Sequence, residues 1–195
     1  MTFLRSICAV ALLCACAWAQ HNTPKFEVFG GGSYVNLPSP SAITAGHYSG
    51  GWDASATHNA NHWLGISVDV SGAYSTRGPL STSGTSESGK HRLHAVMAGP
   101  ILKWRNETRF KPFVRGMLGA VHDSGKTEPT CSTCINLNES QTAFGISLGG
   151  GTDFVVSRRI ALRVQTDWIH ANGSLHAGEN MVRTSFGMVF RFGKR

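Results

Sequence analysis

Five ionisable residues recur on the less apolar face of segments in which apolar and polar residues alternate. They are Asp69, Asp153, Arg163, Asp167 and Arg183. Carboxylates and guanidinium groups gathered on one face could relay protons or act as catalytic acids and bases. They could also form a buried ion-pair cluster, because an unpaired charge in a confined interior is costly. We predict the structural role and assign no catalytic residue, since no nucleophile stands beside a base in the sequence.

Two cysteines, Cys131 and Cys134, resemble a redox pair by spacing alone. Such a centre normally needs a helix N-terminus to stabilise the thiolate, whereas these cysteines lie in a polar, loop-like segment. In an exported chain we expect a structural loop disulfide between them, with free thiols as the alternative. The nine histidines are dispersed, and His91 and His94 point to opposite faces of one strand. We therefore predict no metal site and no cofactor.

The first 19 residues have the pattern of a cleaved secretory signal. Arg5 supplies a positive charge, an apolar run follows to Cys16, and Ala17-Trp18-Ala19 forms a small-x-small cleavage site. We predict a signal peptide at 1–19 and one domain at 20–195. A lipoprotein cleavage box, with lipidation at Cys16, is the alternative interpretation.

The elements that carry the charged residues are predicted to be β-strands, because apolar residues recur with a period of two. The hairpin at 143–168 shows this best, with Phe144, Ile146 and Leu148 alternating with glycine, serine and charged residues. Similar alternation predicts eight strands, at about 26–35, 50–57, 64–74, 91–104, 110–122, 143–154, 160–168 and 181–192.

The predicted connections alternate in length. Long polar segments at 37–48, 76–90, 123–140 and 170–180 follow every odd strand, and short turns at 58–61, 105–109 and 157–159 follow the even strands between them. An antiparallel meander with its long loops at one end and its short turns at the other is typical of outer-membrane barrels.

Two kinds of eight-stranded barrel fit this meander. A soluble, lipocalin-like barrel turns its apolar face inward to bind a ligand, whereas a membrane barrel turns it toward lipid. The polar faces are rich in Gly, Ala and Ser, not in the Lys and Glu of a soluble exterior. Aromatic residues near the strand ends would form an interfacial girdle, although the register puts Trp63 on the polar face: Trp52, Trp63, Tyr74, Trp104 and Trp168. We predict an all-β, eight-stranded, antiparallel, up-and-down transmembrane β-barrel.

Several motifs of the chain resemble the OmpA-like (OmpX-like) family of outer-membrane β-barrels. They are Gly149-Gly150-Gly151-Thr152-Asp153, the run Arg158 to Arg163 with Asp167, Trp63-Leu64-Gly65 with Asp69 and Gly72, and Gly99-Pro100. The resemblance covers about 26–192 and implies periplasmic termini and surface loops. Two departures are that Gly193-Lys194-Arg195 follow the terminal aromatic residue Phe192, and that no peptidoglycan-binding domain follows the barrel. The resemblance therefore does not imply anchoring to the cell wall.

From these patterns we expect a monomeric bacterial outer-membrane protein with a structural or surface-interaction role, whose four loops contact an extracellular ligand that the sequence does not identify. The net charge of +7 in an exported chain favours membrane lipid and lipopolysaccharide as partners over nucleic acid. The charges form no run, and Arg158-Arg159 is interpreted as the marker of a periplasmic turn more than as a binding patch. The alternative is a small enzyme acting on lipid or peptide, built from residues such as Asp123, Ser124 and His170. Bulk transport is not expected, because eight strands leave little room for a channel.

Overall fold

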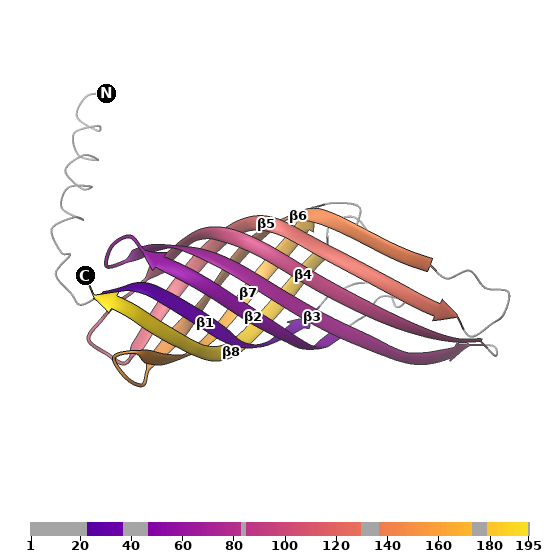
Figure 1. Ribbon diagram of the computed structural model, residues 1–195, viewed down its shortest axis with the longest axis horizontal. Coiled ribbons are helices and arrows are strands. Elements are labelled where there is room, and N and C mark those ends of the chain that lie inside the picture. Colours follow the sequence, from indigo (N-terminus) through magenta and orange to yellow (C-terminus); the bar gives the residue numbers. More distant parts are fainter. Residues whose placement is uncertain (1–22, 37–46, 83–84, 130–136, 173–178, 195) are drawn as a thin grey trace, which may run out of the picture.

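Eight antiparallel strands follow one another around a closed barrel in a computed structural model of the chain (Figure 1). The structure describes residues 23–36, 47–82, 85–129, 137–172 and 179–194. The strands are β1 (Pro24–Asn36), β2 (His47–Asn59), β3 (Leu64–Thr82), β4 (Thr85–Lys103), β5 (Phe110–Pro129), β6 (Leu137–Val155), β7 (Ile160–Asn172) and β8 (Glu179–Lys194). Pairing of β1 with β8 closes the barrel, so the predicted fold class is confirmed. In this described part of the chain, no helix is long and apolar enough to cross a membrane.

The two ends of the barrel differ. The start of β1, the end of β8 and the short connections at 60–63, 104–109 and 156–159 lie at one end, which we call the turn end. The opposite end, at which β1 leads to β2, β3 to β4, β5 to β6 and β7 to β8, is the loop end. The predicted signal peptide at 1–19 and the predicted Cys131–Cys134 disulfide lie outside the described residues.

Four strands continue well past the others at the loop end (Figure 1). The pairing of β3 with β4 runs on to Thr82 and Thr85, and the pairing of β5 with β6 runs on to Thr127 and Leu137. We call this extension the four-strand wall; it comprises residues 75–82, 85–91, 125–129 and 137–143. The prediction of loops at 76–90 and 123–140 was therefore largely wrong. The wall lies beyond the apolar band and is rich in Ser, Thr and Gly, so its sequence lacks the alternation that marks a strand with two different surroundings.

The side chains sort cleanly between the two faces of the sheet. Large apolar residues project outward along every strand, among them Ile66 (60% exposed), Leu118 (58%) and Leu148 (66%). Polar and charged residues at the alternating positions are buried inside. This is the reverse of a soluble ligand-binding barrel and is the arrangement that a barrel has when it faces lipid.

Exposed aromatic residues mark both edges of this apolar band. Trp52, Tyr74 and Trp168 lie toward the loop end, and Trp63 and Trp104 lie at the turn end. Trp63 does not lie on the polar face, as its predicted register had it. It precedes β3 and is 43% exposed, because it belongs to the turn and not to the strand. The segment from Leu64 to Tyr74 matches the length of a tilted transmembrane strand, about 9–11 residues.

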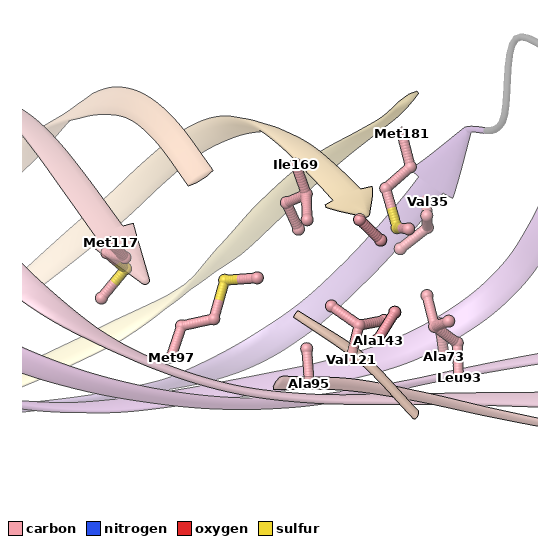
Figure 2. Close-up of a cluster of buried hydrophobic side chains, with 11 residues drawn as sticks. Val35, Ala73, Leu93, Ala95, Met97, Met117, Val121, Ala143, Ile169 and Met181 are labelled. Carbon is pink, nitrogen blue, oxygen red and sulfur yellow. The ribbon is translucent and has the colours of Figure 1, made fainter. Parts of the chain in front are cut away.

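An apolar layer fills the barrel interior toward the loop end (Figure 2). It is built from seven strands and comprises Val35, Ala73, Leu93, Ala95, Met97, Met117, Val121, Ala143, Ile169, Ala171 and Met181. The unbranched methionines suit such a space, because they fill irregular gaps between side chains. The interior is thus stratified, with apolar residues on the loop side and charged residues in the middle and at the turn end.

Candidate functional site

Two arginines and two aspartates form a closed ring across the middle of the interior, the central ion ring. Arg115 donates from Nε and Nη2 to the two carboxylate oxygens of Asp167, at 2.8 and 2.6 Å, and from Nη1 to Oδ2 of Asp69 at 3.0 Å. Arg183 donates from Nη1 to Oδ1 of Asp69 at 2.9 Å and from Nη2 to Oδ2 of Asp167 at 3.0 Å. All four side chains are at most 1% exposed. The ring therefore ties together β3, β5, β7 and β8 from the inside.

Asp53 extends this ring toward β2. Its Oδ2 accepts hydrogen bonds from Ser185 Oγ at 2.6 Å and from Gln165 Nε2 at 2.8 Å. Arg183 Nε lies 3.8 Å from the same oxygen. Asp53 thus shares a cation with Asp69 and Asp167, and neutral donors supply the rest of its hydrogen bonding.

A second group of charges, the turn-end ion cluster, lies nearer the short turns. Lys103 donates to Glu27 and lies 3.5 Å from Asp153, and Arg105 Nη2 donates to Glu27 at 3.0 Å. Arg163 forms a two-pronged pair with Asp153, with N–O distances of 2.6 and 2.9 Å. The sixth member is Arg191, whose Nη2 lies 3.6 Å from Asp153. This cluster contains four cations and two carboxylates.

Aromatic rings cover the cations of the turn-end ion cluster. The guanidinium of Arg163 lies 4.6 Å from the ring centre of Phe113 and 5.4 Å from that of Phe29. The Lys103 ammonium lies 5.7 Å from the Phe113 ring. Because aromatic faces attract cations, these two inward phenylalanines stabilise charge in addition to filling space.

Glycines on β6 create the room that the arginines need. Arg115, Gly149 and Asp167 are successive register partners on β5, β6 and β7. Since Gly149 carries no side chain, Arg115 reaches across β6 to Asp167. A Cβ atom at Gly149 would lie 2.0 Å from Oδ1 of Asp167. Gly149 therefore positions the ring by leaving space.

The structure divides the predicted charge cluster into two groups. Asp69, Asp167 and Arg183 belong to the central ion ring, whereas Asp153 and Arg163 belong to the turn-end ion cluster. The predicted cluster did not include six further members of these groups: Glu27, Asp53, Lys103, Arg105, Arg115 and Arg191. Asp53 could have been found from the sequence, because it shares one face of β2 with the small residues Gly51 and Ser55. The faces that carry Glu27 and Arg115 also carry Phe29 and Phe113, which blurs the contrast between the two faces.

The residues proposed for the enzyme alternative do not assemble. Asp123 and Ser124 lie on β5 and His170 on β7, with β6 between them. Asp123 occupies an inward position of its strand, whereas His170 is outward, stacked 5.8 Å from Trp168 and hydrogen-bonded to Asn180 at 3.0 Å. Over the described ranges, no group of three His, Cys, Asp or Glu residues could hold a metal ion.

The interior pairs its charges. Each of the five carboxylates that are buried among the described residues lies within 3.8 Å of a cationic nitrogen. A cavity of about 10 Å³ lies between Arg183 and the apolar layer, lined by residues such as Ser71 and Leu93. That volume accommodates about one water molecule. The arrangement can therefore brace strands and hold charge, and this cavity does not admit a substrate.

Comparison with known proteins agrees with this architecture. A family model with the description "Outer membrane protein beta-barrel domain" matches residues 6–191. A search among curated protein sequences finds no match.

Among solved structures, the fold resembles neisserial surface protein A, with a TM-score of 0.64 and 15% identity over 86% of this chain and 97% of that one. It also resembles Ail, the attachment invasion locus protein of Yersinia pestis, with a TM-score of 0.54 and 18% identity over 89% of this chain and 100% of that one. A third resemblance is to the outer membrane protease OmpT of Escherichia coli, with a TM-score of 0.50 and 10% identity over 88% of this chain and 98% of that one. At these identities the likeness concerns the fold alone.

Proposed function

Because this chain belongs to the outer membrane protein β-barrel family, we propose that it acts as a binding protein at the cell surface through its four-strand wall. In this family the short turns face the periplasm and the longer loops face outward. The barrel lies in the outer membrane, where its apolar outer face contacts lipid. We propose further that residues 1–19 are removed on export, that the protein is a monomer, and that lipopolysaccharide surrounds its loop end.

The extended strand pairing of the wall carries this proposal. The pairing of β2 with β3 ends at Gly50 and Tyr74, and that of β6 with β7 ends at Phe144 and Asn172. Beyond these points, β3 and β6 have no further strand partner on their outer sides within the described registers. Such edges present backbone groups that an extended segment of another protein can pair with. A partner bound in this way would add a strand to the wall.

The charge of the wall does not favour a polyanionic ligand. One solved structure of Ail contains the heparin analogue sucrose octasulfate. The fold of this chain resembles that structure with a TM-score of 0.52 at 19% sequence identity. The wall of the present chain carries three cations and three carboxylates: Arg77, Lys90, Lys126, Glu87, Glu128 and Glu139. A neutral balance gives no long-range attraction to a sulfated glycan. We therefore propose a protein partner recognised through backbone pairing.

Shortening the wall tests this proposal. Thr76 and Lys90 are register partners, as are Ser124 and Ser140, so Asn-Gly in place of 77–89 or of 125–139 gives each hairpin a two-residue turn. We expect cells that express either variant to lose adhesion to immobilised matrix and serum proteins, while the barrel still folds.

A wall from which the three cations are removed is the matched control. The variant Arg77→Gln, Lys90→Gln, Lys126→Gln keeps the strands and should keep adhesion. Adhesion that survives both truncations, or that is lost in the charge variant alone, would show that the wall does not bind by strand addition.

We propose no catalytic activity. The support is the placement of Asp123 and His170 on opposite faces of the sheet, together with the pairing of every buried carboxylate. The resemblance to a protease is one of fold and transfers no residue roles.

A further inference from the structure

The positive charge of the protein is concentrated at the turn end. The described residues at and beyond the level of the turn-end ion cluster are 23–27, 57–65, 103–111, 153–163 and 191–194. They hold ten Lys or Arg and three Asp or Glu, a net charge of +7. The rest of the described chain holds six Lys or Arg and eight Asp or Glu, a net charge of −2. The charges look scattered along the sequence because the barrel topology gathers separate turns at one end.

Nearby carboxylates do not neutralise this charge. Lys25, Arg109, Arg158 and Arg159 have exposed side chains, and Glu107 is the one exposed carboxylate of these segments. Inside, the turn-end ion cluster has four cations for two carboxylates. The Nε donors of two of these cations, Arg105 and Arg191, find no acceptor among the described residues, although each side chain is only 8% exposed.

The exposed cations lie next to the edge of the apolar band. Arg109 stands between Trp104 (55% exposed) and Phe110 (56%), and the Arg158-Arg159 pair is flanked by Val156 (56%) and Ile160 (36%). Exposed aromatic and aliphatic residues of this kind sit at the boundary between acyl chains and headgroups. The turns therefore hold their guanidinium groups at the depth of the lipid phosphates.

We propose that the turn end binds anionic phospholipids of the periplasmic leaflet, that is, diacyl lipids whose headgroup phosphates carry net negative charge. Arg109, Arg158 and Arg159 contact the phosphates, while Trp63 and Trp104 pack against the adjoining acyl chains. Guanidinium groups suit this task because they pair with phosphate through two parallel hydrogen bonds. The inference rests on the membrane topology and is independent of the surface-binding role. It assigns to Arg158-Arg159 a contact that goes beyond marking a turn.

Tryptophan quenching by brominated lipids tests the proposal. The mature variant Trp52→Phe, Trp168→Phe retains Trp63 and Trp104, both at the turn end. In phosphatidylcholine vesicles we expect brominated phosphatidylglycerol to quench these residues more strongly than brominated phosphatidylcholine at the same mole fraction.

The charge variants then decide which end is responsible. One Lys or Arg near an anionic surface contributes up to about fivefold in binding. Adding Arg109→Gln, Arg158→Gln and Arg159→Gln should thus lower the relative affinity for phosphatidylglycerol by at least about threefold. The matched control Arg77→Gln, Lys90→Gln, Arg92→Gln removes the same charge from the loop side and should leave the preference unchanged. If the two-tryptophan variant does not fold, phosphatidylglycerol retained by the purified protein can be compared between the charge variants by native mass spectrometry.

Three results would overturn the proposal. They are equal quenching by both brominated lipids, an equal loss in the control variant, and a lipid preference that persists without the three arginines. If the triple variant instead loses co-sedimentation with purified peptidoglycan and keeps its lipid preference, the basic turn end binds the cell wall and not lipid.

Discussion

Asp167 is the residue on which the central ion ring depends most, because it accepts three hydrogen bonds from the two arginines, whereas Asp69 accepts two. Arg183 reaches it from the partner position on the adjacent β8, and Arg115 reaches it from β5 across β6, at distances of 2.6 to 3.0 Å. Burying charges costs free energy, and that cost is offset only while each charge keeps its partners. Removing one member leaves the others buried without compensation. The ring therefore makes the barrel sensitive to single substitutions in its interior.

Asp167→Asn tests this dependence with almost no change in side-chain shape. The variant leaves Arg115 and Arg183 facing Asp69 as their remaining shared carboxylate. We expect the free energy of unfolding in detergent micelles, measured by urea titration, to fall by about 3–5 kcal/mol. Glu107→Gln, at an exposed turn position, is the control and should change it by less than about 0.5 kcal/mol. Equal stability of the two variants would rule out a bracing role for the ring.

How much of the interior can be predicted from the sequence differs from residue to residue. Asp153, Arg163 and Asp167 stand out because their strands alternate strictly between apolar and small or charged residues. Arg115 does not, since Phe113 and Met117 share its face and make that face look apolar. The division into two clusters depends on strand register, and the single sequence does not encode register in a visible pattern.

At the scale of the strands, glycine placement decides which side chains can meet. Gly149 separates Arg115 from Asp167 in the register and leaves the path between them open. Gly116, on the neighbouring β5, faces outward, and a Cβ atom there would meet nothing within 4 Å. The two glycines thus have opposite roles although they lie on paired strands.

Gly149→Ala and Gly116→Ala form a matched pair of variants. The first forces a methyl group against the Asp167 carboxylate and the Thr166 carbonyl oxygen, which lie 2.0 and 2.7 Å from the ideal position of the new carbon. Overpacking of this kind costs about 1–3 kcal/mol. We expect a lower urea midpoint for Gly149→Ala and an unchanged or higher one for Gly116→Ala. A tolerated Gly149→Ala would mean that the ring does not need the space at this position.

The strands themselves show where sequence patterns succeed and where they stop. The sequence predicts all eight membrane-crossing segments, because one face meets lipid and the other the interior, although inward Phe29 and Phe113 blur the alternation in β1 and β5. The wall has no such pattern, because it lies beyond the apolar band and is rich in Ser, Thr and Gly, and the sequence therefore predicts loops there. Alternation reports a difference between two surroundings; where there is no difference, a strand leaves no such signal.

At the scale of the whole molecule, the stratified interior bears on transport. The apolar layer lies on the loop side (Figure 2). Two groups of paired charges occupy the middle and the turn end. The cavity below the apolar layer measures about 10 Å³. An ion would have to pass both the apolar residues and the paired guanidinium groups.

We therefore expect no steady single-channel conductance when the purified protein is inserted in planar bilayers. Asp167→Ala, which opens the central ion ring but keeps the apolar layer, should stay closed as well. Stable channels of the wild-type protein at moderate voltage would show that the interior opens and that the packed arrangement is not the conducting state.

The central claim is that the chain folds as a lipid-facing barrel. The most direct measurement is electrophoretic mobility of the mature protein after refolding in detergent or lipid vesicles, with and without boiling. A closed barrel resists dodecyl sulfate until heated, so we predict a compact, fast band in the unboiled sample. After boiling, the band should shift to the position of the unfolded mature chain, whose mass is below the 20.9 kDa of the full 195 residues because residues 1–19 are missing. Identical bands in both samples, together with a folded monomer in detergent-free buffer, would contradict the account.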